Sequence, residues 1–195
     1  MNNTPTDWLL QVPGSALADG RIALLALLLI AAAVIDYRTF RIPNWLTVGG
    51  TVLGLLFSTV DSAQPLLGFL WALGAAAVGL LILLPGYALR IMGAGDVKLM
   101  AMVGAFLGLP QILPAVLFSF VTGGIAALLF ALISNRMARL AGNVHDIVEG
   151  MVLSTIAGQR LGGMAPAASI GKLPYGVSIS AGTLLYLVAH QLGYL

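Results

Sequence analysis

Long apolar stretches separated by short polar loops constrain the fold of this chain more than any other feature of its sequence. Of the 195 residues, 59% are hydrophobic and only 8% are charged, whereas a soluble domain carries about 25% charged residues. A predominantly apolar stretch of about 20 residues is long enough to cross a bilayer as a helix. The composition therefore predicts an all-α, polytopic membrane protein that has the lipid bilayer as a partner.

The order of the apolar stretches predicts one domain, residues 1–195, built as a bundle of about six transmembrane helices. A polar segment, residues 1–20, precedes the bundle, and residues 134–173 form a longer polar loop. We expect the third helix to end before Pro85, and Pro110 to separate the fourth helix from the fifth. The expected helices cover residues 17–36, 45–60, 65–84, 97–109, 110–133 and 174–195.

Part of the loop 134–173 has apolar residues at helical spacing, with charged residues between them. This pattern predicts an amphipathic helix that lies on the cytoplasmic membrane surface. A tethered surface segment is favoured over a lid that docks substrate. The apolar positions are Met137, Leu140, Val144, Ile147, Val148 and Met151.

The distribution of basic residues predicts which side of the membrane each loop faces. The loops after the first, third and fifth expected helices contain eight lysines or arginines, and the opposite side contains only Arg21. Basic residues favour cytoplasmic loops, so we expect these three loops in the cytoplasm and both termini outside. The eight residues are Arg38, Arg41, Arg90, Lys98, Arg136, Arg139, Arg160 and Lys172.

Two aspartates, Asp36 and Asp96, are the strongest candidates for chemistry. An ionisable side chain at or inside a bilayer is costly and indicates function by default, and the predicted topology brings both aspartates to the cytoplasmic face. Two neighbouring carboxylates that are partly removed from water do not both ionise easily, so one keeps its proton while the other acts as a base. Such a pair can activate a water molecule against a peptide carbonyl without a metal.

The helix ends predict different roles for the two aspartates. If a helix begins at Val97, its dipole favours the ionised form of Asp96. If the first helix ends at Asp36, its dipole disfavours the ionised form of that residue. Asp96 would then be the base and Asp36 the acid, although a coupled pair titrates as a unit.

Several residues beside the aspartates have candidate supporting roles. Gly93 and Gly95 permit a sharp turn and leave space for an extended substrate, although Asp96 could simply cap the following helix. Lys98 and Arg38 could lower the pKa of a carboxylate, but anchoring to lipid head groups is the favoured interpretation.

Asn44 and Tyr175 are further candidates at the same membrane face. Asn44 could orient a substrate, but capping of the second helix is the favoured interpretation. Tyr175 opens the last helix on the cytoplasmic side, so it either approaches the aspartates or serves as an interfacial aromatic residue.

Composition also bears on cofactors and partners. The chain has no cysteine, which excludes disulfides, thiolate metal sites and a cysteine nucleophile. His145, Asp146 and Glu149 are interpreted as a solvated loop surface, so we expect neither a metal nor another cofactor. The net charge of +2 is too small to suggest a nucleic-acid partner.

Small residues predict close helix packing at two places. Gly50 with Gly54, and Gly104 with Gly108, have the spacing that lets neighbouring helices approach one another. Packing inside one bundle accounts for both pairs, so they do not require a dimer, and the oligomeric state stays open.

Three short motifs match one known family in their order and spacing. They are Asp36-Tyr37-Arg38 with Ile42-Pro43-Asn44, then Gly93-Ala94-Gly95-Asp96-Val97-Lys98-Leu99, then Leu173-Pro174-Tyr175-Gly176-Val177. Together they resemble the first aspartate motif, the Gly-x-Gly-Asp motif and the Pro-Tyr-Gly segment of bacterial type IV prepilin peptidases. The similarity covers the transmembrane core from about residue 22 to the C-terminus.

This resemblance implies an intramembrane aspartic endopeptidase with Asp36 and Asp96 as its catalytic pair. Its substrates would be prepilin or pseudopilin proteins, cut after a short basic leader at the cytoplasmic face of the bacterial inner membrane. Larger relatives add a cysteine-containing cytoplasmic domain and N-methyltransferase activity. Without cysteines or room for that domain, the chain resembles the short, peptidase-only branch that serves tight-adherence (Flp-type) pili, and N-methylation is not expected.

Other classes of function use similar features. A small transporter could bind a proton or cation at the same aspartates, but such sites usually lie near the midplane between repeated halves. A non-catalytic assembly subunit would explain the bundle but not the paired aspartates. Presenilin-like proteases also use Gly-x-Gly-Asp, but the Pro-Ala-Leu motif that accompanies it is absent from this sequence.

Overall fold

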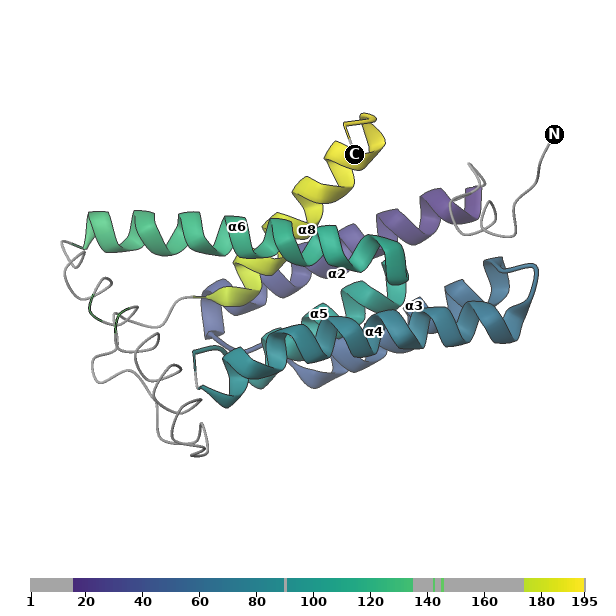
Figure 1. Cartoon of the computed structure of the whole chain (residues 1–195), viewed down its shortest axis with the longest axis horizontal. Helices are drawn as coiled ribbons and strands as arrows, with labels where there is room; N and C mark the ends of the chain where they lie inside the picture. Colours follow the sequence, from purple (N-terminus) through teal and green to yellow (C-terminus); the bar gives the residue numbers. More distant parts are fainter. Residues whose placement is uncertain (1–15, 90, 135–141, 143–144, 146–173, 195) are drawn as a thin grey trace.

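The computed structural model describes residues 16–89, 91–134, 142, 145 and 174–194, and the regular elements within these ranges are helices (Figure 1). They are α2 (Ala16–Thr39), α3 (Asn44–Asp61), α4 (Pro65–Ala88), α5 (Ala94–Leu107), α6 (Leu109–Ile133) and α8 (Tyr175–Gln191). Three of them are long and apolar enough to cross a membrane, namely Gly20–Thr39 of α2, all of α4 and all of α6. The prediction of an all-α polytopic membrane protein is confirmed.

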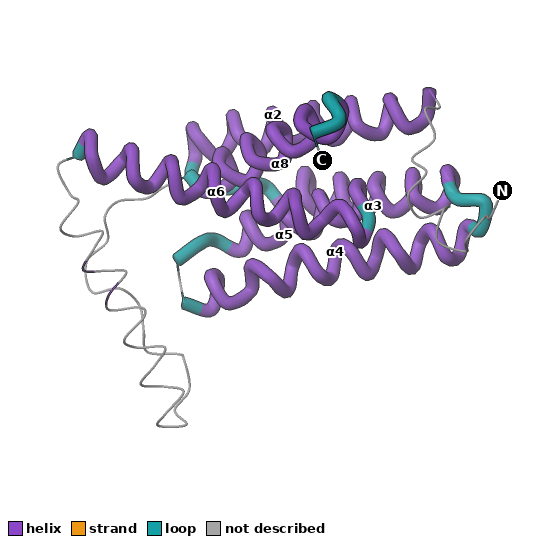
Figure 2. The backbone as a smooth tube through the Cα atoms, turned by 45° about the horizontal axis from the view of Figure 1, so that its top comes forward, coloured by secondary structure: helices purple, strands orange, loops and turns teal. Residues whose placement is uncertain are grey.

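Helix α5 is the centre of the bundle. It contacts each of the other five described helices, and its neighbours surround it in Figures 1 and 2. Ten of its 14 residues are buried. At a rise of about 1.5 Å per residue it spans about 21 Å, which is shorter than the bilayer core of about 30 Å. The helix that carries Asp96 is therefore enclosed mainly by protein rather than by lipid.

Glycines allow the backbones around α5 to approach closely. A Cβ atom at Gly104 of α5 would collide with the backbone carbonyl of Ala75 in α4. A Cβ atom at Gly79 of α4 would lie 2.6 Å from the carbonyl oxygen of Met100, again in α5. Backbone atoms yield little, so these contacts require glycine and hold α4 and α5 together.

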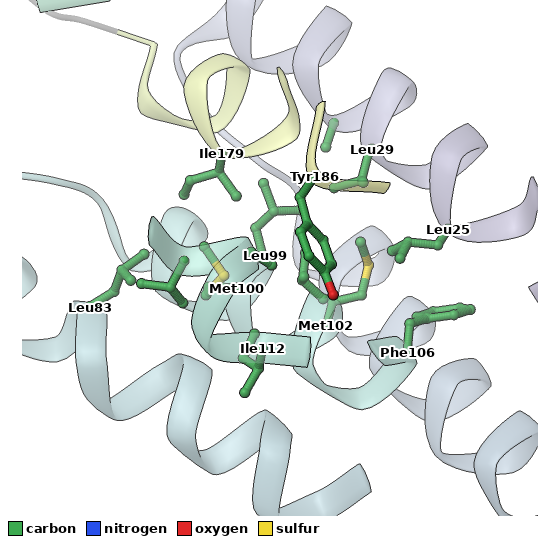
Figure 3. Close-up of a cluster of buried hydrophobic side chains, with 14 of the residues drawn as sticks. Leu25, Leu29, Leu83, Leu99, Met100, Met102, Phe106, Ile112, Ile179 and Tyr186 are labelled. Carbon is green, nitrogen blue, oxygen red and sulfur yellow. The ribbon is translucent and has the colours of Figure 1, made fainter. Parts of the chain in front are cut away.

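The apolar core is built around the side chains of α5 (Figure 3). In that view Leu99, Met100, Met102 and Phe106 of α5 lie between labelled side chains of α2, α4, α6 and α8. Each of these four α5 side chains is at most 1% exposed. The surrounding side chains are Leu25 and Leu29 from α2, Leu83 from α4, Ile112 from α6, and Ile179 and Tyr186 from α8.

Arg21 lies near the start of α2, far from Asp36 along the same helix. Its Nη2 donates a hydrogen bond of 2.9 Å to Oγ of Ser58, which donates one of 3.2 Å to the carbonyl oxygen of Ala105. Ala105 belongs to the last turn of α5, where a positive charge is favourable. The one basic residue expected on the outer side therefore binds protein groups that join α2, α3 and α5.

Several predicted boundaries are wrong, and proline accounts for one of them. Helix α4 continues through Pro85 to Ala88, because a proline in the last turn loses one hydrogen bond while its carbonyl still accepts the N–H of Leu89. Helix α2 continues past Asp36 to Thr39. Helix α8 ends at Gln191.

The Gly-x-Gly-Asp stretch and Gly108 also differ from expectation. Helix α5 begins at Ala94, so residues 94–96 form its first turn rather than a loop before it. The break between α5 and α6 occurs at Gly108, whose φ of +85° favours glycine. No atom would lie within 4 Å of a Cβ atom there, so Gly108 serves a turn and not the helix packing that was predicted.

Some predictions concern residues outside the described ranges. They are the polar segment before residue 16, the amphipathic helix expected within 134–173, and the charged residues Arg90, Arg136, Arg139, Asp146, Glu149, Arg160 and Lys172. His145 is described and exposed. The predictions for the other residues remain predictions.

Substitution of Gly104 tests the close approach of α5 to α4. We expect Gly104→Ala to destabilise the protein by about 1–3 kcal/mol or more, because the added methyl group meets backbone atoms of Ala75. The matched control is Gly124→Ala in α6, where nothing lies within 4 Å of the added atom. The control should change stability by less than about 1 kcal/mol.

Thermal unfolding of the two variants in detergent micelles measures this difference. Equal melting temperatures for Gly104→Ala and Gly124→Ala would contradict the tight packing of α5 against α4.

Candidate active site

Asp36 and Asp96 come from distant parts of the chain to one end of the bundle. Asp36 lies in the last turn of α2, and Asp96 lies in the first turn of α5. The end of α2 and the starts of α5 and α8 lie together on the left of Figure 1. The two side chains are 5% and 7% exposed, so both carboxyl groups are removed from bulk water. We call Asp36 and Asp96 the carboxylate pair.

The Asp36 carboxylate is held by the start of α8. Its Oδ2 accepts a hydrogen bond of 2.8 Å from the backbone N–H of Gly176, the second residue of that helix. A Cβ atom at Gly176 would lie 2.8 Å from the same oxygen, so only glycine allows this approach. The free N–H groups at a helix start favour a negative charge.

The Asp96 carboxylate is held by its own helix start. Its Oδ2 accepts a hydrogen bond of 2.9 Å from the backbone N–H of Gly93, three residues earlier. Asp96 is the third residue of α5, where a carboxylate commonly reaches back to the N–H of the capping residue. The capping role weighed for Asp96 is therefore real, and it orients the side chain.

The two carboxylates interact electrostatically. Asp96 lies outside the three candidate membrane spans. Burial raises its pKa to about 6, the hydrogen bond from Gly93 opposes this increase, and the negative charge of Asp36 adds to it. A carboxyl group with a pKa of about 6 exchanges its proton near neutral pH, as a general acid or base requires.

Tyr175 is the first residue of α8 and is partly buried. Burial raises the pKa of its phenol, and the charge of Asp96 adds to that increase. The phenol therefore lies within electrostatic range of Asp96, and both alternatives for the role of Tyr175 remain predictions.

The helix ends do not separate the roles of the two aspartates as expected. Asp96 lies at the start of α5, which favours its ionised form as predicted. Asp36 lies near the end of α2, but it also accepts the N–H of Gly176 at the start of α8. The end of α2 disfavours the ionised form of Asp36, whereas the N–H at the start of α8 favours it. The assignment of Asp36 as the acid therefore loses its basis.

Lys98 and Asn44 bind each other, which neither prediction included. Lys98 Nζ donates a hydrogen bond of 2.8 Å to Oδ1 of Asn44, joining the starts of α5 and α3. Asn44 is the first residue of α3, the capping position belongs to Pro43, and no side chain caps this helix. The prediction that Asn44 caps the helix is wrong, because the backbone enters the helix one residue earlier than expected.

The remaining candidates have simpler surroundings. Arg38 is exposed on the last turn of α2, where its positive charge suits the helix end. Gly93 has a φ of −84°, which any residue can adopt, so the turn does not use the conformational freedom of glycine. Gly95 lies inside the helix, where a Cβ atom would be 3.1 Å from Cβ of Ile42. The missing side chain of Gly95 therefore lets α5 approach the connection between α2 and α3 closely.

Sequence reasoning missed two residues at this site, Gly176 and Ile42. Both belong to motifs that were recognised, but neither was given a role. The sequence already placed Gly176 in the first turn of the last helix, on the same side of the membrane as the aspartates. This position could have identified its free N–H group as a donor to a carboxylate. Within the described ranges no group of three or more His, Asp or Glu side chains could hold a metal ion.

Substitution of Asp96 tests its burial through the pH dependence of stability. Its pKa of about 6 in the fold lies above the ordinary value of 3.8. Folding therefore favours the protonated form, and this contribution is fully present below about pH 4 and is lost as the pH rises through about 6. We expect Asp96→Asn, which is neutral throughout, to be more stable than wild type near pH 7.5, by at most about 3 kcal/mol.

Melting temperatures near pH 4 and pH 7.5 provide the measurement, and the difference should vanish at the lower pH. The control is Asp61→Asn, because Asp61 interacts with the positive charge of Arg21 and should gain no stability on neutralisation. An Asp96→Asn variant that is no more stable than wild type near pH 7.5 would count against the burial of a charged Asp96.

Comparisons with known proteins match this region of the chain. A family model described as the type IV leader peptidase family matches residues 23–128, a range that contains both aspartates. The chain is similar to a prepilin leader peptidase/N-methyltransferase of Dickeya chrysanthemi, with 37% identity over 129 residues. These residues are 63% of this chain and 44% of the relative, so the chain spans less than half of that relative's length. No solved structure matches the chain significantly.

Proposed function

The chain belongs to the type IV leader peptidase family, and on that premise we propose that it is an intramembrane aspartic endopeptidase that cleaves prepilin-like proteins. The observation that carries this proposal is the carboxylate pair itself. Two buried aspartates interact at one end of the bundle, and a backbone N–H group orients each of them. Protein interiors rarely bury two like charges together, and catalytic carboxyl pairs are a known reason for doing so.

The pair hydrolyses a peptide bond in two steps. With one proton shared between them, the ionised carboxylate takes a proton from water, whose oxygen attacks the scissile carbonyl carbon. The protonated partner gives its proton to the carbonyl oxygen, which forms a gem-diol. In the second step the first carboxyl group protonates the amide nitrogen, the partner takes a proton from the gem-diol, and the C–N bond breaks. The pair ends with one proton, as it began.

The basic residues around the pair support its placement at the cytoplasmic face of the membrane. The pair lies at the end of an apolar bundle that also carries Arg38 and Lys98. Basic residues favour the cytoplasmic face, so we propose that cleavage occurs at the cytoplasmic face of the bacterial inner membrane, with both termini of the chain outside. The apolar helix of a prepilin-like or pseudopilin substrate can then remain in the bilayer while the leader lies in the cytoplasm.

The proposal covers leader hydrolysis and not methyl transfer. The name of the Dickeya relative includes both activities, but the carboxylate pair accounts only for the first. Assignment to the short branch that serves tight-adherence (Flp-type) pili is part of the proposal, and it rests on the absence of cysteine from the sequence.

A proton- or cation-coupled transporter is the alternative function. Transporter sites usually lie near the bilayer midplane, between repeated halves of the protein. The pair instead lies where α2 ends and α5 begins, and this position favours the peptidase.

Cleavage of a prepilin-type substrate by the purified protein tests the proposal. We expect Asp36→Asn and Asp96→Asn each to lower kcat by about 10²–10⁴-fold or more, because either change removes an acid or base from the pair. Asp61→Asn is the control, since it makes the same chemical change far along the bundle and should leave cleavage intact. A melting temperature no lower than that of wild type in each variant would exclude unfolding as the cause.

Two outcomes would overturn the proposed function. Cleavage that survives Asp36→Asn or Asp96→Asn at the wild-type rate would remove that aspartate from the mechanism. Proton or cation flux through wild-type protein in liposomes, without cleavage of any prepilin-type substrate, would favour the transporter.

A further inference from the structure

One apolar side chain, that of Ile42, lies between the two backbone segments that hold the carboxylate pair. Ile42 belongs to the short connection between α2 and α3 and is only 9% exposed. Its Cδ1 would lie 2.7 Å from a Cβ atom at Gly176, and its Cβ would lie 3.1 Å from a Cβ atom at Gly95. The side chain therefore packs directly against two glycine backbones, one from α8 and one from α5.

Each of these glycines is coupled to one carboxylate. Gly176 donates its N–H to Asp36. Gly95 immediately precedes Asp96 in the first turn of α5. The carboxylate of Asp96 accepts a hydrogen bond from the N–H of Gly93. A displacement of either backbone relative to Ile42 would therefore move one carboxylate relative to the other.

The connection that carries Ile42 is held by local hydrogen bonds on the side of α2. Oγ1 of Thr39 lies 2.8 Å from the carbonyl oxygen of Ile35 and 2.9 Å from that of Arg41. Phe40 adopts a φ of +51°, which is uncommon for a bulky residue, and its N–H donates to the carbonyl of Asp36 at 2.8 Å. The backbone leading to Ile42 is thus restrained by local bonds and cannot easily follow a displaced neighbour.

We propose that Ile42 is a positioning residue that sets the separation of Asp36 and Asp96 by filling the space between Gly176 and Gly95. This inference rests on the proposed function for its catalytic consequence. The side chain suits the role because branching at Cβ leaves it few rotamers. Because both neighbours are glycines, the Ile42 side chain contacts backbone on both sides. Backbone atoms cannot move aside as a flexible side chain could, so the size of Ile42 determines the spacing.

A graded series of substitutions tests the consequence for catalysis. Ile42→Val removes only Cδ1, the atom nearest Gly176, whereas Ile42→Ala removes Cγ1, Cγ2 and Cδ1 and keeps Cβ, the atom nearest Gly95. We expect kcat to fall by about 10–100-fold in Ile42→Ala, since a shift of about 1 Å in a catalytic group has effects of that size. Ile42→Val should be intermediate, and KM should change little in both variants.

The matched control is Ile112→Ala, which removes the same atoms from a site in α6 that is 0% exposed. It should lower the melting temperature at least as much as Ile42→Ala, with kcat nearly unchanged. The pH profile gives a further readout, because the spacing of two carboxylates determines how far their apparent pKa values separate. The width of the profile should change in Ile42→Ala and stay the same in Ile112→Ala.

A measurement that does not need activity separates this proposal from the proposed function. The chain has no cysteine, so spin labels can be attached at Tyr37→Cys and Ala94→Cys, two exposed positions near the carboxylates. We expect the distance distribution measured by electron paramagnetic resonance to shift or broaden by about 1 Å or more in Ile42→Ala. Ile112→Ala should leave it unchanged.

Each result then has one meaning. An unchanged label distance in Ile42→Ala, or an equal loss of kcat in Ile42→Ala and Ile112→Ala, would overturn the positioning role. If the aspartate variants retain cleavage, the proposed function fails, and the label distances still decide whether Ile42 sets the separation.

Discussion

The hydrogen bonds from backbone N–H groups to the two buried carboxylates are the interactions on which the arrangement of this site depends. Gly176 at the start of α8 binds Asp36, and Gly93 at the start of α5 binds Asp96. An ionised carboxylate in an apolar bundle loses the stabilisation of water, and a helix start replaces part of it without adding another charge. The pair can therefore be buried and still have access to a charged form, which acid–base chemistry requires.

The position of these helix starts depends in turn on how closely the bundle packs. Gly104 and Gly79 bring α5 and α4 into backbone contact, and Ile42 separates the start of α5 from the start of α8. At the other end Arg21 and Ser58 join α2 and α3 to the last turn of α5. Helix α5 is thus restrained at its start, along its length and at its end, which limits the freedom of Asp96 relative to Asp36.

Sequence patterns predicted the helices well, because the length of an apolar stretch is itself the physical reason why a helix forms there in a membrane protein. Apolar stretches of sufficient length predicted each of the six described helices, and charge placement predicted that Asp36 and Asp96 share one end. Boundaries were less predictable. Pro85 was expected to end a helix, yet a proline in the last turn loses only one hydrogen bond. Asn44 was expected to cap a helix, but its side chain instead accepts a bond from Lys98, 54 positions later.

The sequence by itself determined that the chain is a helical membrane protein and identified two carboxylates as candidates for chemistry, because hydrophobic length and isolated charges are local properties. Only the tertiary structure decided how those carboxylates are held. The N–H of Gly176 reaches Asp36 across 140 positions, and Ile42 contacts Gly95 and Gly176 at once. Such contacts depend on distances between segments that are remote in the chain, and no local pattern of residues specifies those distances.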